Sequence, residues 1–432
     1  MLKRSLRRHV KLARPLEARP TFRRRIFGLS FPVPSNDPLA GTAAGDGIPF
    51  LFIASVVVGL PLTLWAYKCL MLVAFQRKII YLPSVPPGTR NESLAHDERT
   101  RERDSSLSDI DWKEVNIESR APTRLLRRKV ALKGVELGWK TTQPAPNLGS
   151  AGETRPPRVV VIYLQGNAGT PLLRIPLFRR LLQPEVIRST SARRPSIPPR
   201  SESPSQALED LTVVAVAPRS FWLSTRSTPT EASVLADYRA ALDYAYGQYG
   251  PSAKYVLYGH SLGGAAAILL LEQLSIPPFF AQPQHSPPAP TISGVIFENP
   301  LPSIPFMVRA LYPQKWLPYH YLGFASFDRW DAIGRLRALA RGASTTTSMT
   351  TTVPSLWIRS GRDEIIPTEA QDGVREMFEN WKAIEDGARR GAESGEVRAR
   401  WVKIDGALHD TAYLEGKWRD ELRQFLREIA KR

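Results

Sequence analysis

One stretch of the sequence constrains the fold more than any other. The apolar run Lys254–Tyr258 has the length of a buried strand, and the pattern G-H-S-L-G follows it at residues 259–263. A helix rich in small residues is predicted to begin immediately afterwards. A G-x-S-x-G turn between a strand and a helix is typical of a nucleophile elbow, in which a strained turn exposes the serine hydroxyl. Ser261 is therefore the candidate nucleophile, and Gly259 and Gly263 remove side chains that would collide where strand and helix cross.

Strands alternate with helices on both sides of this elbow. Short strands are predicted over 112–118, 125–130 and 135–139, and longer apolar strands over 158–164, 212–217, 254–258, 294–298, 355–358 and 400–404. Helices are predicted over 172–182, 231–246, 262–274, 369–382 and 418–429. This alternation predicts an α/β class domain with a doubly wound, mostly parallel sheet.

Composition divides the chain into an arm, an anchor, a linker and one domain. The expected bounds are 1–46 for a basic, largely disordered arm, 47–75 for the anchor, 76–110 for the linker and 111–432 for the domain. Three inserts of biased composition, near 188–206, 277–290 and 345–352, are expected to leave the domain as surface loops.

The anchor is predicted from the 20 residues 48–67, which carry no charge. Twenty apolar residues are enough to cross the hydrocarbon core of a bilayer, so a single transmembrane helix is expected. The apolar residues 69–75 could extend it. The alternative for this segment is a buried helix of a soluble protein.

The orientation follows from the basic arm. Residues 1–26 contain ten Lys or Arg and the single acid Glu17. Because positive flanks stay in the cytosol, the arm should be cytosolic and the domain lumenal, in the endoplasmic reticulum or another endomembrane. The tripeptide Asn91-Glu92-Ser93 is then a glycosylation acceptor on the lumenal side. A mitochondrial presequence is the alternative for an arginine-rich amino terminus.

The charge of the chain does not indicate a nucleic-acid partner. Formal net charge is +18, but residues 1–26 of the arm supply half of it, and no nucleic-acid-binding motif accompanies the rest. The bilayer is the expected partner instead, and protein partners are not predicted. The single cysteine, Cys69, excludes an internal disulfide.

A serine nucleophile needs a base and an orienting acid, in the chain order Ser, acid, His. Of the six histidines, only His409 follows a late strand and the penultimate helix. Asp363 follows the strand before that and is the expected acid. Glu364 is its competitor, and Asp410 is a weaker one because it adjoins the histidine.

An oxyanion hole needs two backbone N–H groups aimed at one oxygen. Leu262 follows the nucleophile at the start of a helix and should supply one. Asn167, in the loop after the strand at 158–164, should supply the other. No close cluster of His, Cys and Asp has metal-ligand spacing along the chain, so neither a metal nor a cofactor is expected.

Several motifs together resemble the α/β-hydrolase superfamily, and within it the membrane-anchored bud-emergence-type group. They are YLQGNAG at 163–169, GHSLGG at 259–264, FENPLPSI at 297–304, GRD at 361–363 with Pro367, HDT at 409–411, and QRKIIYLP at 76–83. The resemblance spans about residues 50–430 outside the inserts. It implies a serine-hydrolase fold on a single-pass anchor, with lipid esters or acyl thioesters as the expected substrates.

The chain departs from this group at two places. The group has histidine where this chain has Gln165, whose amide can still hydrogen-bond the loop. Its usual D-Y-R-G-Y-G is here A-P-R-S-F-W at 217–222, a loop that borders the active site. The loss of both glycines invites a second function class, a membrane-anchored scaffold without turnover. An apolar stretch over 300–330 is expected to form a cap that favours an acyl chain.

Overall fold

The computed structural model describes residues 50–92, 109–119, 129–139, 158–184, 210–275, 290–341, 353–389 and 399–432. The predicted arm, residues 93–108 of the predicted linker, and nearly all of the three inserts lie outside these described residues. The chain divides into two units, Met1–Gly59 and Leu60–Arg432, and the second contains the folded domain.

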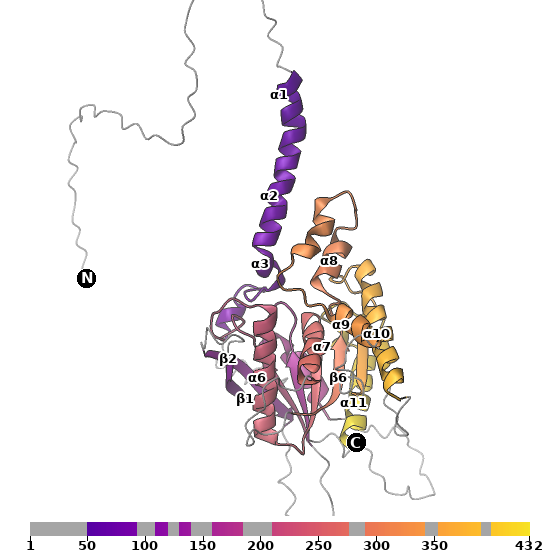
Figure 1. Ribbon diagram of the computed structural model, residues 1–432. Helices are drawn as coiled ribbons and strands as arrows, with labels where there is room; N and C mark the ends of the chain where they lie inside the picture. The colour runs from indigo at the N-terminus through magenta and orange to yellow at the C-terminus, as the bar shows by residue number, and fades with distance from the viewer. Residues whose placement is uncertain are drawn as a thin grey trace, which may run out of the picture. The chain divides into compact units, whose positions relative to one another are not determined.

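The domain is built on one sheet, in which the described residues form eight strands in the order β1-β2-β4-β3-β5-β6-β7-β8 (Figure 1). The strands are β1 Ile110–Ser119, β2 Val130–Trp139, β3 Val159–Leu164, β4 Leu211–Val216, β5 Lys254–His260, β6 Ile292–Glu298, β7 Ser355–Ser360 and β8 Arg400–Ile404. From β4 to β8 all neighbours are parallel, while β2 pairs antiparallel with both β1 and β4. The predicted doubly wound, mostly parallel sheet is confirmed.

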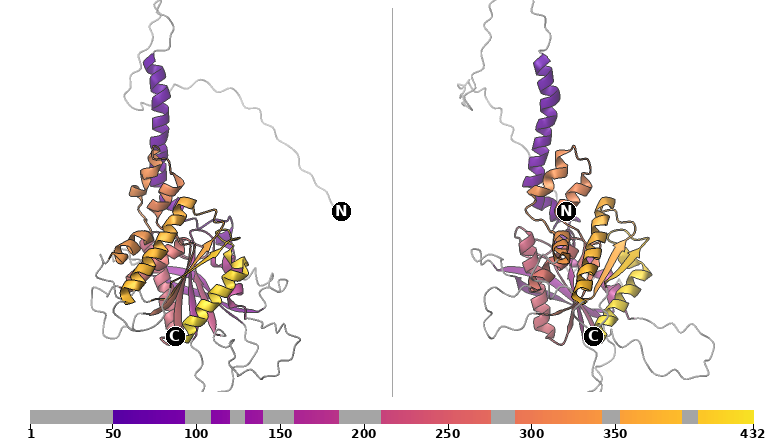
Figure 2. Two further views of the ribbon diagram at one scale, coloured as in Figure 1. Left: turned by 90° about the vertical axis from the view of Figure 1, so that its right-hand side faces the viewer. Right: turned by 45° about the vertical axis from the view of Figure 1, so that its right-hand side comes forward.

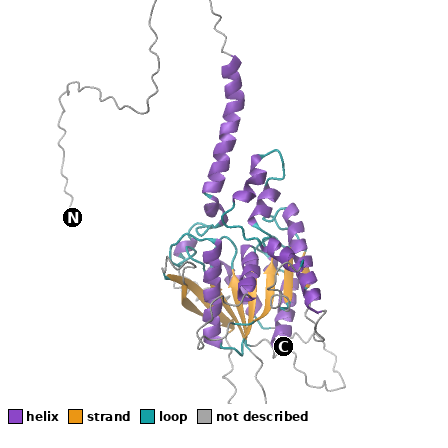
Figure 3. Ribbon diagram, in the orientation of Figure 1, coloured by secondary structure: helices purple, strands orange, loops and turns teal. Residues whose placement is uncertain are grey.

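The sheet carries helices on both faces (Figures 2 and 3). Helices α6 Glu231–Tyr249 and α7 Leu262–Ser275 pack on one face, with α9 Ala332–Ala340 and α10 Thr368–Arg389 beside them. Helices α5 Ile175–Leu182 and α11 Gly416–Lys431 pack on the other. All six residues of β3 are buried, and so are all six of β4, as strands covered on both faces require.

Close helix packing depends on a small residue in β6. A Cβ at Gly294 would lie 2.9 Å from Ile429 Cδ1 and 3.2 Å from the ring of Phe425, both on α11. Gly294 therefore lets α11 lie directly on the sheet. Larger residues there would push the helix outward.

The amino-terminal half of the domain differs from the prediction in one detail. Three short strands were expected, but β1 and β2 are two ten-residue strands that pair from Ile110 with Trp139 to Ser119 with Val130. The predicted break at 131–134 lies inside β2. Gly134, in this stretch, approaches the carbonyl of Ala215 in β4 too closely for any side chain. Residues 125–128 lie outside the described part.

The predicted anchor is helical over Phe50–Ala74, as α1 Phe50–Ala54, the π-helical η1 Ser55–Gly59 and α2 Leu60–Ala74. Its 25 residues, with a mean hydropathy of 2.0, are long and apolar enough to cross a membrane. None of its residues is buried, so it is not a core helix of this chain. Residues 47–49 of the predicted anchor are not described.

Part of the predicted linker belongs to the domain. We call residues 76–92 the strap: it contains α3 Gln76–Ile80 and the 3₁₀ turn η2 Thr89–Asn91. Tyr81 is 2% exposed, and its hydroxyl accepts a hydrogen bond from the indole of Trp330 at 3.1 Å. The strap therefore packs on the domain rather than leading loosely to it.

The segment after β6 forms the cap region, residues 300–330. It contains α8 Ile304–Leu311 and the 3₁₀ helix η5 Pro318–Ala325. Short 3₁₀ turns, η3 Pro171–Arg174 and η7 Ala412–Leu414, lie near the carboxyl ends of β3 and β8.

Candidate active site

The elbow has the strained geometry that its sequence predicts. Ser261, between β5 and α7, has a φ of +55°, a left-handed conformation that side chains rarely adopt. A Cβ at Gly263 would lie 1.9 Å from the carbonyl oxygen of Leu164, and one at Gly259 would lie 2.4 Å from that of Gly263. Both glycines are therefore required sterically. The Ser261 N–H donates to the carbonyl of Glu298 at 2.9 Å, which fixes the turn against β6.

The structure brings the predicted base and acid together. Nδ1 of His409 lies 2.8 Å from Oδ2 of Asp363, and both side chains are almost fully buried. The other carboxylate oxygen of Asp363 accepts the N–H groups of Ile365 at 3.0 Å and Ile366 at 2.8 Å. Because the carboxylate can only accept, the imidazole proton sits on Nδ1 and leaves Nε2 as the basic nitrogen.

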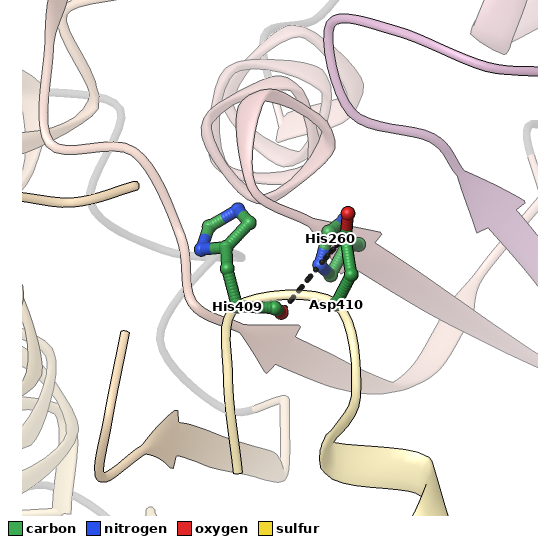
Figure 4. A group of neighbouring side chains, drawn as sticks. All are labelled: His260, His409 and Asp410. Atoms are coloured by element: carbon green, nitrogen blue, oxygen red, sulfur yellow. Dashed lines mark hydrogen bonds and ion pairs between the residues drawn. The ribbon is translucent and has the colours of Figure 1, made fainter. Parts of the chain in front are cut away.

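Three neighbours hold the backbone of His409. Its N–H donates to Oε2 of Glu364 at 2.9 Å, and its carbonyl accepts from the amide of Asn299 at 2.9 Å. Nε2 of His260 lies 3.2 Å from the same carbonyl (Figure 4). Glu364, the competitor for the role of the acid, thus contacts the main chain of the histidine and not its ring.

Asp410, the other competitor for the role of the acid, forms its ion pair with Arg174. Its Oδ1 lies 2.5 Å from Nη2 of Arg174 and 3.3 Å from Nε2 of His260. Burial would raise the pKa of Asp410, but the charge of Arg174 holds it below its ordinary value. Burial, and then Arg174, hold the pKa of His260 well below its ordinary value, so this imidazole is neutral and carries its proton on Nε2.

A cluster that sequence spacing missed does form in space. His260, His409 and Asp410 offer potential metal-ligand atoms within 4.8 Å of one another (Figure 4). The donor chemistry does not fit a metal, because the protonated Nε2 of His260 faces the acceptors and Arg174 already neutralises Asp410. The cluster is explained as a hydrogen-bond network behind the histidine.

Of the two predicted oxyanion donors, Leu262 directly follows the serine at the start of α7, and Asn167 lies in the loop after β3. A Cβ at Gly166 would lie 3.4 Å from Cβ of Ser261, so the loop after β3 passes beside the nucleophile. Among the described residues, no hydrogen bond of a loop or turn uses the N–H of Asn167 or of Leu262. The prediction that both groups bind a substrate oxygen therefore requires no hydrogen bond of a described loop or turn to be broken.

Ser261, Asp363 and His409 follow β5, β7 and β8 and lie at the same carboxyl edge of the sheet. Within the described part of the chain, the Ser261 hydroxyl makes no hydrogen bond; in ligand-free sites the serine–histidine contact is often long. A strained serine between strand and helix, followed along the chain by an acid and a histidine at one sheet edge, decides the fold. The chain has the α/β-hydrolase fold.

Comparisons with solved structures place this α/β-hydrolase domain beside the following proteins. An alpha-beta hydrolase from Vibrio vulnificus is 14% identical at a TM-score of 0.47, covering 81% of this chain and 92% of its own. A putative hydrolase from Agrobacterium vitis S4 is 13% identical at 0.42, covering 74% and 99%. A thermostable esterase from Pseudomonas putida ECU1011 is 14% identical at 0.43, covering 79% and 91%. No protein-family model and no curated protein matches the chain.

The altered loop at 217–222 keeps a conformation that suits glycine. Ser220 has a φ of +70° and Trp222 a φ of +42°, at the two positions where the bud-emergence-type group has glycine. Trp222 is fully buried, and its indole N–H donates to the carbonyl of Glu92 in the strap at 2.9 Å. Arg219 is buried in a two-pronged ion pair with Asp237, at 2.9 and 2.7 Å. The loop is thus rigidly held despite the lost glycines.

Gln165 behaves differently from the expectation. Its side chain is buried, and among the described residues neither amide atom has a hydrogen-bond partner. Its main-chain carbonyl accepts a hydrogen bond from the Tyr238 hydroxyl at 3.1 Å. The expected hydrogen bond from this amide to the loop is not formed.

Sequence reasoning missed three residues that support the site. Arg174 carries no motif of its own, Asn299 lies in the FENPLPSI motif but was given no role, and Glu364 was considered only as an alternative acid. One signal was available for Asn299: it directly follows a buried strand, where it adopts a φ of +45°. Asparagine tolerates this conformation better than most residues.

Proposed function

We propose that this protein is a membrane-anchored serine hydrolase that cleaves carboxylic esters or thioesters through Ser261, His409 and Asp363. The observation that carries the proposal is the 2.8 Å contact between Nδ1 of His409 and Asp363, at the edge of the sheet where Ser261 occupies a strained elbow. An imidazole oriented in this way presents a basic nitrogen to a serine hydroxyl, as acyl transfer requires.

The proposed reaction proceeds in two half-reactions. Oγ of Ser261 attacks the carbonyl carbon while Nε2 of His409 accepts the hydroxyl proton, and Asp363 stabilises the imidazolium. The N–H groups of Leu262 and Asn167 stabilise the oxyanion. Collapse of the tetrahedral intermediate breaks the bond to the alcohol or thiol, which takes the proton from the imidazolium. Water then attacks the acyl-enzyme with the histidine as base again, and the carboxylic acid leaves.

Lipid or acylated molecules are the proposed substrates. The cap region carries many aromatic and aliphatic side chains, several of them exposed, and it contacts the end of the apolar helix that we propose as anchor. A deletion of residues 1–75 would test this preference, because it removes the anchor and keeps the strap. We expect turnover of a vesicle-borne ester to fall sharply while a short soluble ester is spared. Equal loss on both substrates would argue against delivery from the bilayer.

The second candidate is a membrane-anchored scaffold that keeps the fold without turnover. The unpartnered amide of Gln165 and the two strained residues of the 217–222 loop favour it, because they depart from the pattern of the bud-emergence-type group beside the site. Nothing in the contacts of Ser261, Asp363 or His409 requires loss of activity.

A fluorophosphonate probe distinguishes the two candidates. We expect the full-length protein in detergent to be labelled covalently, the Ser261→Ala variant not at all, and the Asp363→Asn variant much more slowly. A matched control is Ser275→Ala, which removes a hydroxyl at the far end of α7. If the wild type and Ser261→Ala are equally unlabelled, the scaffold replaces the enzyme.

We assign the protein to the bud-emergence-type group on its motifs, with the arm cytosolic and the domain in the lumen of the endoplasmic reticulum or another endomembrane. Asn91 is exposed on the strap and is the proposed glycosylation site. A glycosidase-sensitive mass shift in cells that Asn91→Gln abolishes would support the lumenal orientation. An unglycosylated protein in purified mitochondria would favour the alternative address.

A further inference from the structure

The cap region exposes an unusual set of large apolar side chains. Trp316 is 70% exposed, Phe324 78% and Phe327 63%. Leu311 and Tyr321, each more than half exposed, lie in the same segment. Exposed aromatic groups gathered in one segment mark a surface that contacts a partner or a membrane. We call the four aromatic residues of this set, Trp316, Tyr321, Phe324 and Phe327, the cap aromatics.

The cap region contacts α2 and the start of the strap directly. The ring centroids of Trp65 and Trp316 are 6.0 Å apart, and Nζ of Lys68 lies 4.3 Å from the ring centroid of Tyr319. The side chain of Gln76, just beyond α2, donates to the carbonyl of Ala325 at 3.1 Å and accepts the N–H of Phe327 at 2.7 Å. The cap region therefore lies alongside the last turns of α2 and the start of the strap.

The contact between Trp65 and Trp316 sets the depth of the cap. A bilayer core takes about 20 residues of helix. Any stretch of about 20 residues within Phe50–Ala74 contains Trp65, because this residue is too near the middle of the helix to be left out. If α2 crosses the membrane, Trp316 therefore lies at membrane depth, and the residues that contact Gln76, beyond the end of the helix, lie at the headgroup layer.

The charges around the cap aromatics fit that layer. Arg309 and Arg329 line a cavity of about 340 Å³, together with His320, Tyr321 and Phe324. Among the described residues, neither guanidinium group has an ion-pair or hydrogen-bond partner. Arginine binds phosphate oxygens in a two-pronged geometry, and aromatic side chains concentrate at membrane interfaces. None of the residues lining the cavity is Ser261, Asp363 or His409.

We propose that the cap aromatics are inserted into the interfacial layer of the same bilayer that α2 crosses, with Arg309 and Arg329 on lipid headgroup phosphates. The inference rests on the anchoring in the proposed function, and it is independent of whether Ser261 is catalytic. It makes the cap a second membrane contact, which orients the domain on the bilayer and opens the cap towards lipid rather than towards water.

Site-directed fluorescence in vesicles tests the insertion. In a full-length Cys69→Ala background, single cysteines are introduced as Phe324→Cys, Phe327→Cys or, as the control, Lys431→Cys at the exposed end of α11. Each is labelled with a polarity-sensitive dye and reconstituted into phosphatidylcholine vesicles with or without phosphatidylserine. Flotation resistant to sodium carbonate is measured in parallel as the check on anchoring.

We expect spin-labelled lipids to quench the dyes at positions 324 and 327, and soluble iodide to lose access to them; position 431 should show the reverse. The difference should grow with phosphatidylserine and diminish when Arg309 and Arg329 are both changed to Gln. A protein that floats, yet whose dye at 324 is quenched by iodide like that at 431, overturns the insertion alone. A protein that does not float overturns both the anchoring and this inference.

Discussion

At Trp222, backbone strain and side-chain burial contribute to the free energy of unfolding with opposite signs. It is a bulky residue at a φ of +42°, a region that glycine occupies freely, so the change Trp222→Gly relieves strain. The same change deletes a fully buried indole and its hydrogen bond to the carbonyl of Glu92. The sign of the effect on stability depends on which contribution is larger.

The magnitudes favour the side chain. Truncating a buried aromatic residue costs about 3–5 kcal/mol, and the lost hydrogen bond adds about 1 kcal/mol. Relief of a strained φ returns about 1–3 kcal/mol. We therefore expect Trp222→Gly to lower the free energy of unfolding by about 3 kcal/mol, and Trp222→Phe, which keeps most of the packing and the strain, by about 1 kcal/mol.

Thermal unfolding of the full-length protein in detergent, followed by circular dichroism, measures both variants. A loss of about 3 kcal/mol corresponds to a fall in melting temperature on the order of 5 °C for a domain of this size. A Trp222→Gly variant at least as stable as the wild type would refute the reasoning. Strain would then dominate, and the indole would contribute little to holding the strap.

Two further predictions concern the histidine and its neighbours. Asp363→Asn should lower turnover of a soluble ester by about 10⁴-fold because the imidazole tautomer is no longer fixed. Glu364→Gln still accepts the N–H of His409 and should lower turnover by less than about tenfold. Equal losses would contradict this division of roles. His260 has its pKa held well below 6.5 in the fold, so the unfolded chain binds more protons at lower pH, and stability should fall as pH drops below 6.5, by up to about 1.4 kcal/mol per pH unit. In His260→Asn this slope should be smaller by up to that amount, as measured by unfolding at several pH values; an unchanged slope would contradict a neutral, buried imidazole.

The fold could be predicted because its signals are local. The strand of the elbow was predicted to start at Lys254 and does, and the strand at 400–404 has the predicted bounds. Helix ends were less accurate: the helix predicted over 231–246 extends to Tyr249, and the one over 369–382 extends to Arg389. Polar residues at the ends of these helices gave no periodic signal, and contacts with the fold decide where such helices stop.

The network around His409 could not be predicted, because it depends on contacts between distant parts of the chain. Arg174 lies 236 residues from Asp410, and Asn299 lies 110 residues from His409. Hydrogen bonds of this kind are made only when the strand order places their elements at one edge. The sequence ranked Asp363 above Glu364 but did not predict that Glu364 would accept the N–H of His409, because the directions of adjacent side chains depend on the loop conformation.

The strap, which begins directly after the apolar helix, is hydrogen-bonded to the loop that follows β3. Its Leu82 N–H donates to the carbonyl of Asn167 at 2.8 Å, and the carbonyl of Val85 accepts the N–H of Gly169, also at 2.8 Å. These two bonds hold the loop that carries a proposed oxyanion donor, and they hold it from a segment that begins directly after α2. The carbonyl of Asn167 is thereby fixed pointing at the strap. Because a peptide unit is planar, the N–H of Ala168, which shares its unit with this carbonyl, is fixed with it, and the N–H of Asn167 belongs to the unit directly before. The strap is therefore part of the active-site scaffold, and a truncation that removes it should disturb the oxyanion loop even though Ser261, Asp363 and His409 all remain.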